Sequence, residues 1–590
     1  MSDSISRRDW LTTMGVAGAG AFIAPLPPPP APTTSTPILP LTSTSDVFIP
    51  PRGRAFMKFS FDFPEPSVEF AGLRFGFLVF TRENTYALDP GAMSTDGTGG
   101  GDTLAVSATR LVWAGGQQSV PGRINAHLRR EGDAVFCDVM AEMGQPIKAV
   151  TVVLRGVPRG KLSTGGDPFD PKDDEVLWGY PFGAGDLFGD NTARGMGTPL
   201  TVVQGSDGRC IALSSLDDHV RAKRFYFQPG EQGYRVELVH EVEGWLDRRT
   251  VQVPTWRIGR ATSLEAAVAP HYAHIESAYH VPRWETRADV PDWLRRTQLV
   301  VTLHGMHFTG YIFNDYARML EILRWIATQI PADRVLAFIS AWDGRYYWDY
   351  PTYQAAPRMG GEAGFRRLVQ EGQRLGFRIM PMFGANAANS KLSNFAGFAD
   401  AATARVDGDQ FNLDWVDWDN DRHQEGFGAY MNLGVASWRR WLQGRIADVI
   451  DRYGVDAYFL DIIGGWVNNT KADMHEGARA LVTELRSRYP RVLACGEFLY
   501  DALLELFPLY HASYSPHYVP YARFFSHLSH PAPGRGSSGV HESGFGRWDP
   551  GTLSLTKREG LIPTLNIVDD TFTKYRDQMA AVIAQAKAWG

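Results

Sequence analysis

The chain has 590 residues, which is too many for a single hydrophobic core, so two or three domains are expected. Hydrophobic residues make up 44% of the chain and charged residues 21%, the balance of a globular protein. The formal net charge of −6 argues against a general nucleic-acid binder, because such proteins need a basic surface that displaces counterions. Three cysteines are too few for a disulfide framework, although a Cys137–Cys210 bridge stays open.

The first 24 residues resemble a twin-arginine export signal. Ser6-Arg7-Arg8-Asp9-Trp10-Leu11 precedes a weakly apolar run over residues 14–24. Residues 25–46 are rich in Pro, Thr and Ser and are typical of an extended tether. No later segment has the roughly 18 uninterrupted apolar residues of a membrane span. We therefore expect a periplasmic or extracellular protein without a transmembrane helix.

Residues 47–291 have the pattern of a β-rich domain. Short alternating runs are separated by Gly, Pro and Asp clusters, and the first amphipathic helix is expected only at residues 263–279. The clearest runs are residues 56–61, 73–80, 134–140, 149–154 and 236–242. An antiparallel β-sandwich is the simplest architecture for this domain.

Residues 292–590 alternate between buried strands and amphipathic helices. Strands are expected at residues 299–303, 335–339, 378–383, 457–460, 492–494 and 562–567, with helices between them. The helix at residues 436–453 has the clearest apolar stripe. This pattern predicts a (β/α)8 barrel with insertions, although strands six and seven cannot be placed within residues 510–561.

Two carboxylates follow consecutive strands of the predicted barrel. Asp461 ends strand four and Glu497 ends strand five, and barrel active sites lie at this edge of the strands. Neighbouring parallel strands lie about 4.8 Å apart. The carboxyl groups could therefore approach to the separation of about 5–5.5 Å that retaining glycosidases use. In such a site, Asp461 attacks the anomeric carbon, while Glu497 protonates the leaving oxygen and then activates water.

The motifs around these acids resemble those of α-glycoside-cleaving barrels. The stretch Asn432-Leu433-Gly434, Trp438, Tyr453-Gly454-Val455-Asp456 and Phe459-Leu460-Asp461 is followed by Gly496-Glu497. It is similar to the α-amylase group and, with a β-sandwich before the barrel, to endo-α-N-acetylgalactosaminidase-like enzymes. This resemblance alone implies α-linked substrates, an Asp nucleophile after strand four and a Glu acid/base after strand five.

The sequence departs from the α-amylase pattern at one position and leaves the position of the third catalytic acid open. The α-amylase Arg two residues before the nucleophile is replaced here by Phe459, which argues against a true α-amylase. The third catalytic acid is not evident from the motifs, and Asp569, after the last strand, is the best candidate for it.

Several residues near the predicted strand ends are candidates for binding an oligosaccharide or polysaccharide. The segment after strand two is crowded with aromatic rings, which can stack on sugars or pack in a core, and its polar members can bind hydroxyl groups. The candidates are Trp342, Asp343, Arg345, Tyr346, Asn386, Trp466 and His517. No redox cofactor and no catalytic metal are expected, and the sequence leaves the oligomeric state open.

Two other functional classes stay open. His304 and His307, with His511, His517 and Asp569, could form the metal set of an amidohydrolase, although the two first histidines lack the expected spacing. A degenerate barrel could also bind carbohydrate without cleaving it. The acidic segment at residues 414–421 superficially resembles a chitinase motif but follows no apolar strand, so we interpret it as a loop that could hold a structural Ca²⁺.

Overall fold

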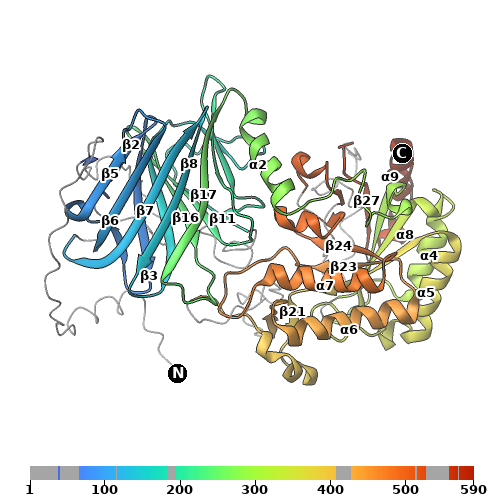
Figure 1. The fold of residues 1–590 in the computed structure, drawn as a ribbon. Helices are drawn as coiled ribbons and strands as arrows, with labels where there is room; N and C mark the ends of the chain where they lie inside the picture. Colours follow the sequence, from blue (N-terminus) through green and yellow to red (C-terminus); the bar gives the residue numbers. More distant parts are fainter. Residues whose placement is uncertain are drawn as a thin grey trace.

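The computed structural model describes the short strand Ile38–Leu39 and residues 65–113, 116–181, 194–307, 309–406, 427–511, 514–525, 557–568 and 570–590. The predicted export signal, almost all of the tether, the acidic segment 414–421 and Asp569 lie outside these residues. Two parts lie side by side, an antiparallel N-terminal part and a barrel formed by the C-terminal half (Figure 1).

Within its described residues, the N-terminal part is one hydrogen-bonded network of 17 strands, in which only β11 and β12 pair in parallel. Long strands such as β6 alternate buried and exposed side chains, which is the pattern of a strand with one face on the core. The strands are β1 (Ile38–Leu39), β2 (Ser67–Phe70), β3 (Leu73–Thr81), β4 (Thr85–Leu88), β5 (Met93–Gly97), β6 (Thr103–Trp113), β7 (Ser119–Glu131), β8 (Ala134–Met143), β9 (Ile147–Val157), β10 (Lys161–Ser163), β11 (Val176–Tyr180), β12 (Arg194–Gly195), β13 (Leu200–Gln204), β14 (Cys210–Ser215), β15 (Lys223–Gly230), β16 (Gly233–Glu241) and β17 (Thr250–Ala261). The large antiparallel β structure is confirmed, whereas its division into two sandwich layers stays a prediction.

The C-terminal part contains eight parallel strands in the order β26-β25-β24-β23-β20-β19-β18-β27. A parallel bridge between Phe524 and Leu561 links the two ends of this order, so the strands form a barrel. The strands are β18 (Leu299–Met306), β19 (Val335–Arg345), β20 (Arg378–Gly384), β23 (Ala457–Asp461), β24 (Leu493–Glu497), β25 (Leu509–His511), β26 (Arg523–Phe525) and β27 (Thr564–Ile567), and the hairpin of β21 (Ala387–Asn389) and β22 (Gly428–Tyr430) is inserted after β20. The predicted barrel is confirmed, and β25 and β26 are the strands that the sequence could not place.

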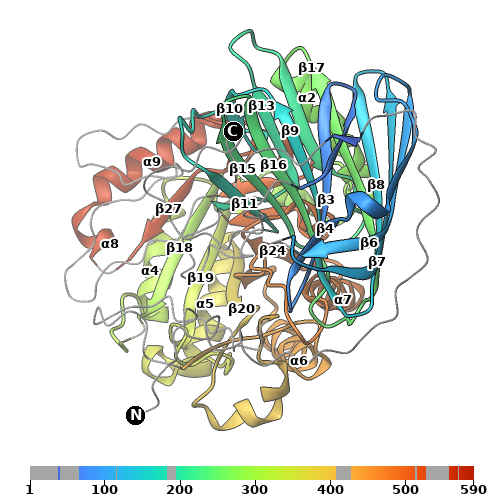
Figure 2. The same cartoon turned by 90° about the vertical axis from the view of Figure 1, so that its left-hand side faces the viewer.

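Amphipathic helices cover the barrel where the sequence predicts them, and α4, α5, α6 and α7 follow one another around the strands (Figure 2). Helix α6 coincides with the predicted range, buries Trp438, Leu442 and Ile446, and ends at Gly454 in the left-handed conformation that a helix C-terminus favours. The α-helices are α2 (Leu264–Ala278), α3 (Asp292–Arg295), α4 (Tyr316–Ile326), α5 (Gly361–Leu375), α6 (Ala436–Tyr453), α7 (Met474–Arg488), α8 (Thr571–Lys574) and α9 (Arg576–Trp589). The short 3-10 helices are η3 (Pro90–Ala92), η4 (Ala332–Arg334), η5 (Pro357–Met359), η6 (Ser393–Gly397), η7 (Ala399–Ala401), η8 (Asp501–Glu505) and η9 (Pro516–Tyr518).

The N-terminal part contacts the barrel where the barrel has short 3-10 helices in place of full α-helices. Only η8 lies between β24 and β25, and α2 of the N-terminal part lies between the two halves of the molecule (Figure 1). Asp501 of η8 is fully buried and accepts hydrogen bonds of 2.7 Å from Tyr180 Oη and 2.7 Å from Thr198 Oγ1. The guanidinium of Arg287 donates to the backbone oxygens of Leu504 and Tyr521. The two halves are therefore tied together by buried polar contacts.

We expect the Asp501→Asn variant to lose part of the pH dependence of stability. Burial raises the pKa of Asp501 to about 6, from 3.8, so its protonated form stabilises the fold at acidic pH. That contribution, on the order of 3 kcal/mol, is complete below the unfolded pKa and is lost as the pH rises through about 6. Melting temperatures measured between acidic and neutral pH should fall less in the variant than in the wild type. An equal slope in both proteins would contradict this account, and Asp448→Asn on the surface of α6 is the control.

Two further sequence predictions are settled by the described residues. Cys137, Cys210 and Cys495 are all free and buried, so the Cys137–Cys210 bridge is not formed. None of the helices in the described ranges is both long enough and apolar enough to cross a bilayer.

Candidate active site

Asp461 and Glu497 end neighbouring strands of the barrel, as the sequence predicts. Leu460 on β23 lies opposite Gly496 on β24, so the next residue on each strand bears a carboxyl group. Both residues are almost fully buried, with only 2% and 4% of their surface exposed. A buried carboxyl group is costly without polar partners, so the surroundings of this pair determine what it can do.

The backbone turns sharply directly after each acid. Ile462 has a φ angle of 52° and Phe498 a φ angle of 54°. This left-handed conformation is unfavourable for a β-branched or bulky side chain. Such strain persists where the surrounding structure enforces it, and it clusters at functional sites. The same feature at both strand ends therefore marks this edge of the barrel as the candidate site.

Asp461 is held by a hydroxyl group and by the second acid. Tyr347 Oη donates a hydrogen bond of 2.5 Å to Asp461 Oδ2, and the charge of Glu497 acts on Asp461 from the neighbouring strand. Burial, and then the charge of Glu497, raise the pKa of Asp461 well above its ordinary value, while the Tyr347 hydroxyl lowers it. The pair therefore retains a proton, and the Tyr347 hydroxyl partly offsets the rise in the pKa of Asp461.

The two strand ends carry the acids at the same level of the barrel, so the charges of the two carboxyl groups act on one another. The separation of about 5–5.5 Å that retaining glycosidases use stays a prediction for this pair.

Glu497 has a separate partner for each of its oxygen atoms. The backbone N–H of Ile462 donates a hydrogen bond of 2.8 Å to Oε2. His511 lies opposite Glu497 on β25, and its Nδ1 is 3.1 Å from Oε1. The orientation of Glu497 is thus fixed from both neighbouring strands.

The segment after β19 brings three tyrosines next to the acids. The rings of Tyr346 and Tyr347 meet edge to face with centroids 4.3 Å apart, and those of Tyr347 and Tyr350 lie 5.0 Å apart. Burial, and then the charge of Asp461, raise the pKa of all three hydroxyl groups well above the ordinary range. These hydroxyl groups therefore stay protonated and can donate hydrogen bonds.

Asn386, a predicted binding residue, binds the segment after Asp461, which leads to Trp466, another predicted binding residue. Asn386 Nδ2 donates to the backbone oxygens of Ile462 at 3.0 Å and Gly465 at 3.3 Å, and Trp466 follows Gly465. Asn386 Oδ1 and Trp466 Nε1 are buried and make no hydrogen bond within the described part of the chain. Asn386 therefore holds the segment that follows the nucleophile candidate, and contact of Asn386 or Trp466 with a sugar stays a prediction.

Asp343, another predicted binding residue, is buried near Tyr350 and Asp349. Burial raises the pKa of Asp343 to about 8, with a smaller contribution from the charge of Asp349. Its Oδ2 atom makes no hydrogen bond to any described residue. Asp343 is therefore largely protonated at neutral pH and can donate a hydrogen bond.

The structure assigns other contacts to three of the predicted binding residues. Trp342 is fully buried, donates from Nε1 to Met382 O and stacks on Phe365 of α5, so it packs the barrel against its helices and cannot face a sugar. His517 bonds Gly165 O and stacks on Tyr272 of α2, which gives it a role in the contact between the two halves. Arg345 stacks on Trp348 at 4.3 Å, and its role in binding stays a prediction.

The described members of the proposed amidohydrolase metal set do not converge. His304 Nδ1 bonds Ser340 Oγ and His307 Nδ1 bonds Thr309 Oγ1, while His511 bonds Glu497. Within the described ranges, the group of ligating side chains that lies close enough for a metal is elsewhere, at residues 217–219. Asp217 in that group is already bound by the cations of Arg221 and Lys223. These contacts give the amidohydrolase alternative no support.

Sequence reasoning missed two partners of the acids. Tyr347 appears in the sequence only as one ring of an aromatic run, and His511 only as a member of the metal alternative. The position of His511 could not be found because β25 has three residues, too few for a periodic pattern.

Three comparisons relate the chain to known proteins. No protein-family model and no curated protein sequence matches it. Similar solved structures include an α-N-acetylgalactosaminidase, NagBb from Bifidobacterium bifidum: its GalNAc complex has a TM-score of 0.58 at 12% identity, covering 78% of this chain and 84% of that chain. Its complex with Gal-NHAc-DNJ has a TM-score of 0.57 at 13% identity, covering 77% and 79%. The α-galactosidase TtGalA from Thermus thermophilus has a TM-score of 0.42 at 15% identity, covering 66% and 75%.

The chain has an α-glycosidase fold. The predicted resemblance is thus confirmed at the level of the fold, and in this α-glycosidase fold the two acids lie at the barrel edge where active sites are found.

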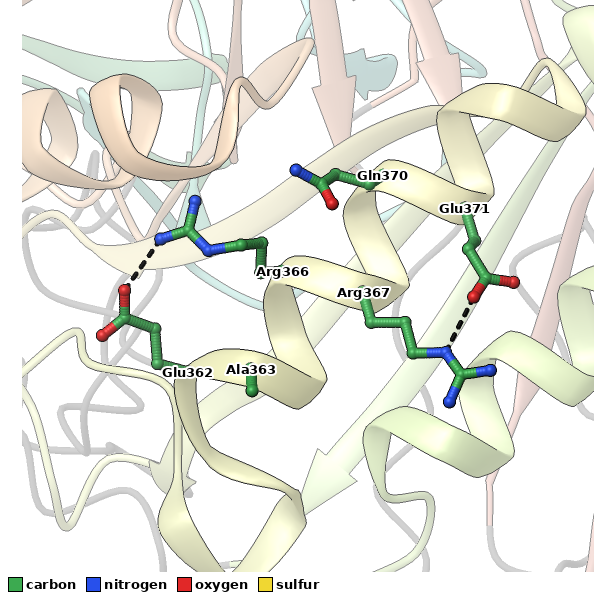
Figure 3. A pocket seen from close by; sticks show the side chains of 6 residues that line it. All are labelled: Glu362, Ala363, Arg366, Arg367, Gln370 and Glu371. Atoms are coloured by element: carbon green, nitrogen blue, oxygen red, sulfur yellow. Dashed lines mark hydrogen bonds and ion pairs between the residues drawn. The ribbon is translucent and has the colours of Figure 1, made fainter.

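A hollow on the outer side of the α-glycosidase barrel lies on α5 and is unrelated to the acids. Figure 3 shows Arg366 paired with Glu362 and Arg367 paired with Glu371 along the helix surface. Ion pairs four residues apart on an exposed helix are common and contribute little to stability. This hollow is therefore a solvated helix face, and it offers no chemistry for sugar cleavage.

We expect Tyr347→Phe to shift the acidic limb of the pH profile. The variant loses the hydroxyl group that lowers the pKa of Asp461, so that pKa rises and Asp461 becomes protonated at a higher pH. The acidic limb of kcat/KM should move toward neutral pH, with a loss of about tenfold on its acidic side. Tyr489→Phe, on the surface near Asp451, is the control. An unchanged limb would show that Tyr347 does not act on the ionised group.

Proposed function

We propose that the protein is a retaining glycoside hydrolase that cleaves α-linked sugars, with Asp461 as nucleophile and Glu497 as acid and base. The observation that supports the proposal most is the buried pair of carboxyl groups at adjacent strand ends, one of which accepts a hydrogen bond from Tyr347. Two carboxyl groups of unequal proton affinity are what this reaction requires. The α-glycosidase fold supports the α preference.

The two acids and several residues near them have defined tasks in this mechanism. Asp461, whose ionised form the Tyr347 hydroxyl stabilises, attacks the anomeric carbon, while Glu497 gives its proton to the leaving oxygen. In the second step Glu497 takes a proton from water, which attacks the anomeric carbon and breaks its bond to Asp461. Asp343, Tyr346, Asn386 and Trp466 are the residues we propose to hold the sugar, and Asp569 stays a proposed third acid outside the described residues.

The sugar itself is proposed from the structural neighbours. NagBb is named an α-N-acetylgalactosaminidase, and its structures include complexes with GalNAc and Gal-NHAc-DNJ. We therefore propose a galacto-configured α-glycoside, with or without a 2-acetamido group, as the first substrate class. We further propose that the N-terminal part is a β-sandwich that braces the barrel through the contacts of Asp501 and Arg287.

A panel of aryl glycosides tests the proposed function. The purified protein should release the aryl alcohol from α-N-acetylgalactosaminide or α-galactoside, and not from the matching β-glycosides. The first-formed sugar should be the α-anomer by NMR, since a double displacement retains configuration. Activity should survive a strong zinc chelator, which would inactivate a metal-dependent amidohydrolase. A β-anomer as first product, or no cleavage of any α-glycoside, would refute the proposal.

We also propose export by the twin-arginine route, on the basis of Arg7 and Arg8 in the N-terminal signal. Replacing both arginines by lysine should leave the protein in the cytoplasm of a bacterial host, as measured by cell fractionation. Equal amounts of both proteins outside the cytoplasm would contradict the proposal.

A further inference from the structure

The mechanism above assigns no task to His511, although this residue makes a direct contact with the acid/base. His511 ends β25 and lies opposite Glu497, with Nδ1 3.1 Å from Oε1. It is 2% exposed, and its ring packs against Phe525 at 5.1 Å, Phe459 at 5.3 Å and Phe338 at 5.9 Å. A ring enclosed by three aromatic side chains is held in one orientation. The packing around the His511 ring therefore fixes its contact with Glu497.

The groups around Glu497 limit what His511 can do. Asp461 faces Glu497 from β23, Tyr346 and Tyr347 interact with it from the segment after β19, and Tyr430 does so from β22. The backbone N–H of Ile462 binds Oε2. The phenolic hydroxyl groups stay protonated and Asp461 is acidic. Among these named neighbours, His511 is thus the side chain with a basic nitrogen at hydrogen-bonding distance from Glu497.

The proton positions follow from counting donors and acceptors. When Glu497 is protonated on Oε2, Oε1 can only accept a hydrogen bond from His511. When Glu497 is ionised, a lone pair on Nδ1 would face a lone pair on Oε1 and repel it. A neutral His511 with its proton on Nδ1 donates to Oε1 in both states. The apolar rings around it favour this uncharged form.

We infer that His511 is a positioning residue, which donates from Nδ1 to Glu497 Oε1 and supports the ionised Glu497 that activates water in the second step. This inference rests on the proposed function. In that step Asp461 is an ester and carries no charge. Water attacks the anomeric carbon, the bond between that carbon and the Asp461 oxygen breaks with its electron pair on Asp461, and the water proton moves to Glu497. A hydrogen bond that stabilises the ionised carboxylate keeps Glu497 unprotonated until it accepts this proton.

Replacement of His511 should slow mainly the second step, in which water is activated, whereas replacement of Glu497 affects both steps. His511→Leu retains the carboxyl group of Glu497, so protonation of the leaving oxygen continues, but the ionised form is less favoured. With a 2,4-dinitrophenyl α-glycoside of the active sugar, kcat should fall about tenfold and KM should fall with it, so that kcat/KM changes less than about threefold. A burst of dinitrophenol should precede the steady state. The alkaline limb of kcat/KM, measured on a substrate with a poor leaving group, should move to higher pH by about one unit.

Azide provides a readout that a purely structural role of His511 would not change. Azide attacks the glycosyl-enzyme without needing a base, so it should restore kcat of His511→Leu and yield an α-glycosyl azide. His511→Asn places an amide N–H near the position of Nδ1 and should behave like the wild type, whereas His511→Gln reaches the position of Nε2 and should behave like Leu. If the Leu variant does not fold, the comparison of the Asn and Gln variants still tests the inference.

Three results would overturn the inference. They are an alkaline limb that moves to lower pH or stays in place, equal losses in kcat and kcat/KM without azide rescue, and Asn and Gln variants that behave alike. Failure of the proposed function is distinct, because then the wild type would cleave no α-glycoside or Asp461→Asn would retain activity.

Discussion

Replacement of Asp461 by Asn is expected to abolish turnover of every α-glycoside that the wild type cleaves. The amide is a poor nucleophile, so no glycosyl-enzyme forms, and kcat should fall by about 10⁴-fold or more. Asn is nearly isosteric and can still accept the Tyr347 hydrogen bond, so the fold should be retained. Stopped assays over hours with purified protein measure the residual rate, and circular dichroism checks the fold.

The loss at Asp461 is specific only if the same chemical change elsewhere is harmless. Asp448→Asn is the matched control, because Asp448 lies on α6 and forms ion pairs with Arg445 and Arg452 along the surface of that helix. It should keep wild-type kcat within about twofold, as surface changes usually do. An Asp461→Asn protein with more than a few per cent of wild-type activity, after contamination is excluded, would remove Asp461 as the nucleophile.

Replacement of Glu497 by Gln is expected to produce a loss that depends on the leaving group. Substrates with poor leaving groups need protonation, so kcat/KM should fall about 10²–10⁴-fold, the usual contribution of a general acid. A dinitrophenyl glycoside needs little protonation, and its kcat/KM should stay within about tenfold of wild type. Its kcat should fall and respond to azide, because water activation in the second step also needs Glu497.

The dependence on the leaving group, and not the size of the loss, identifies the acid/base. A plot of log kcat/KM against the pKa of the released phenol should be steeper for the variant than for the wild type. Glu484→Gln, on the exposed side of α7, is the control with the same change in charge. Equal slopes for wild type and variant would assign Glu497 to packing or orientation.

The sequence was a good guide where an element is long or a residue ends a strongly apolar strand. The range of α6 coincides with its prediction, because eighteen residues carry a continuous apolar stripe. Asp461 could be predicted at the barrel edge because Ala457–Leu460 is apolar and a carboxyl group directly after it needs a polar environment.

Short elements and side-chain directions could not be predicted from the sequence. β25 and β26 have three residues each, and η8, the 3-10 helix between β24 and β25, has five, all too short for a periodic apolar pattern. Trp342 has the composition of a sugar platform, but β19 turns its ring toward α5, a direction that local sequence does not determine. The proximity of the two acids depends on the register of β23 and β24, which is a long-range property.

The central claim is that Asp461 forms a covalent bond to the sugar during turnover. A 5-fluoro-α-glycosyl fluoride of the active sugar should trap this bond, since fluorine at C5 slows both steps while fluoride leaves readily from C1. Mass spectrometry of the peptic digest should find the fluorosugar on the peptide that contains Asp461, at one equivalent per chain. A label on a different peptide, or an active enzyme that is not labelled at all, would contradict the claim.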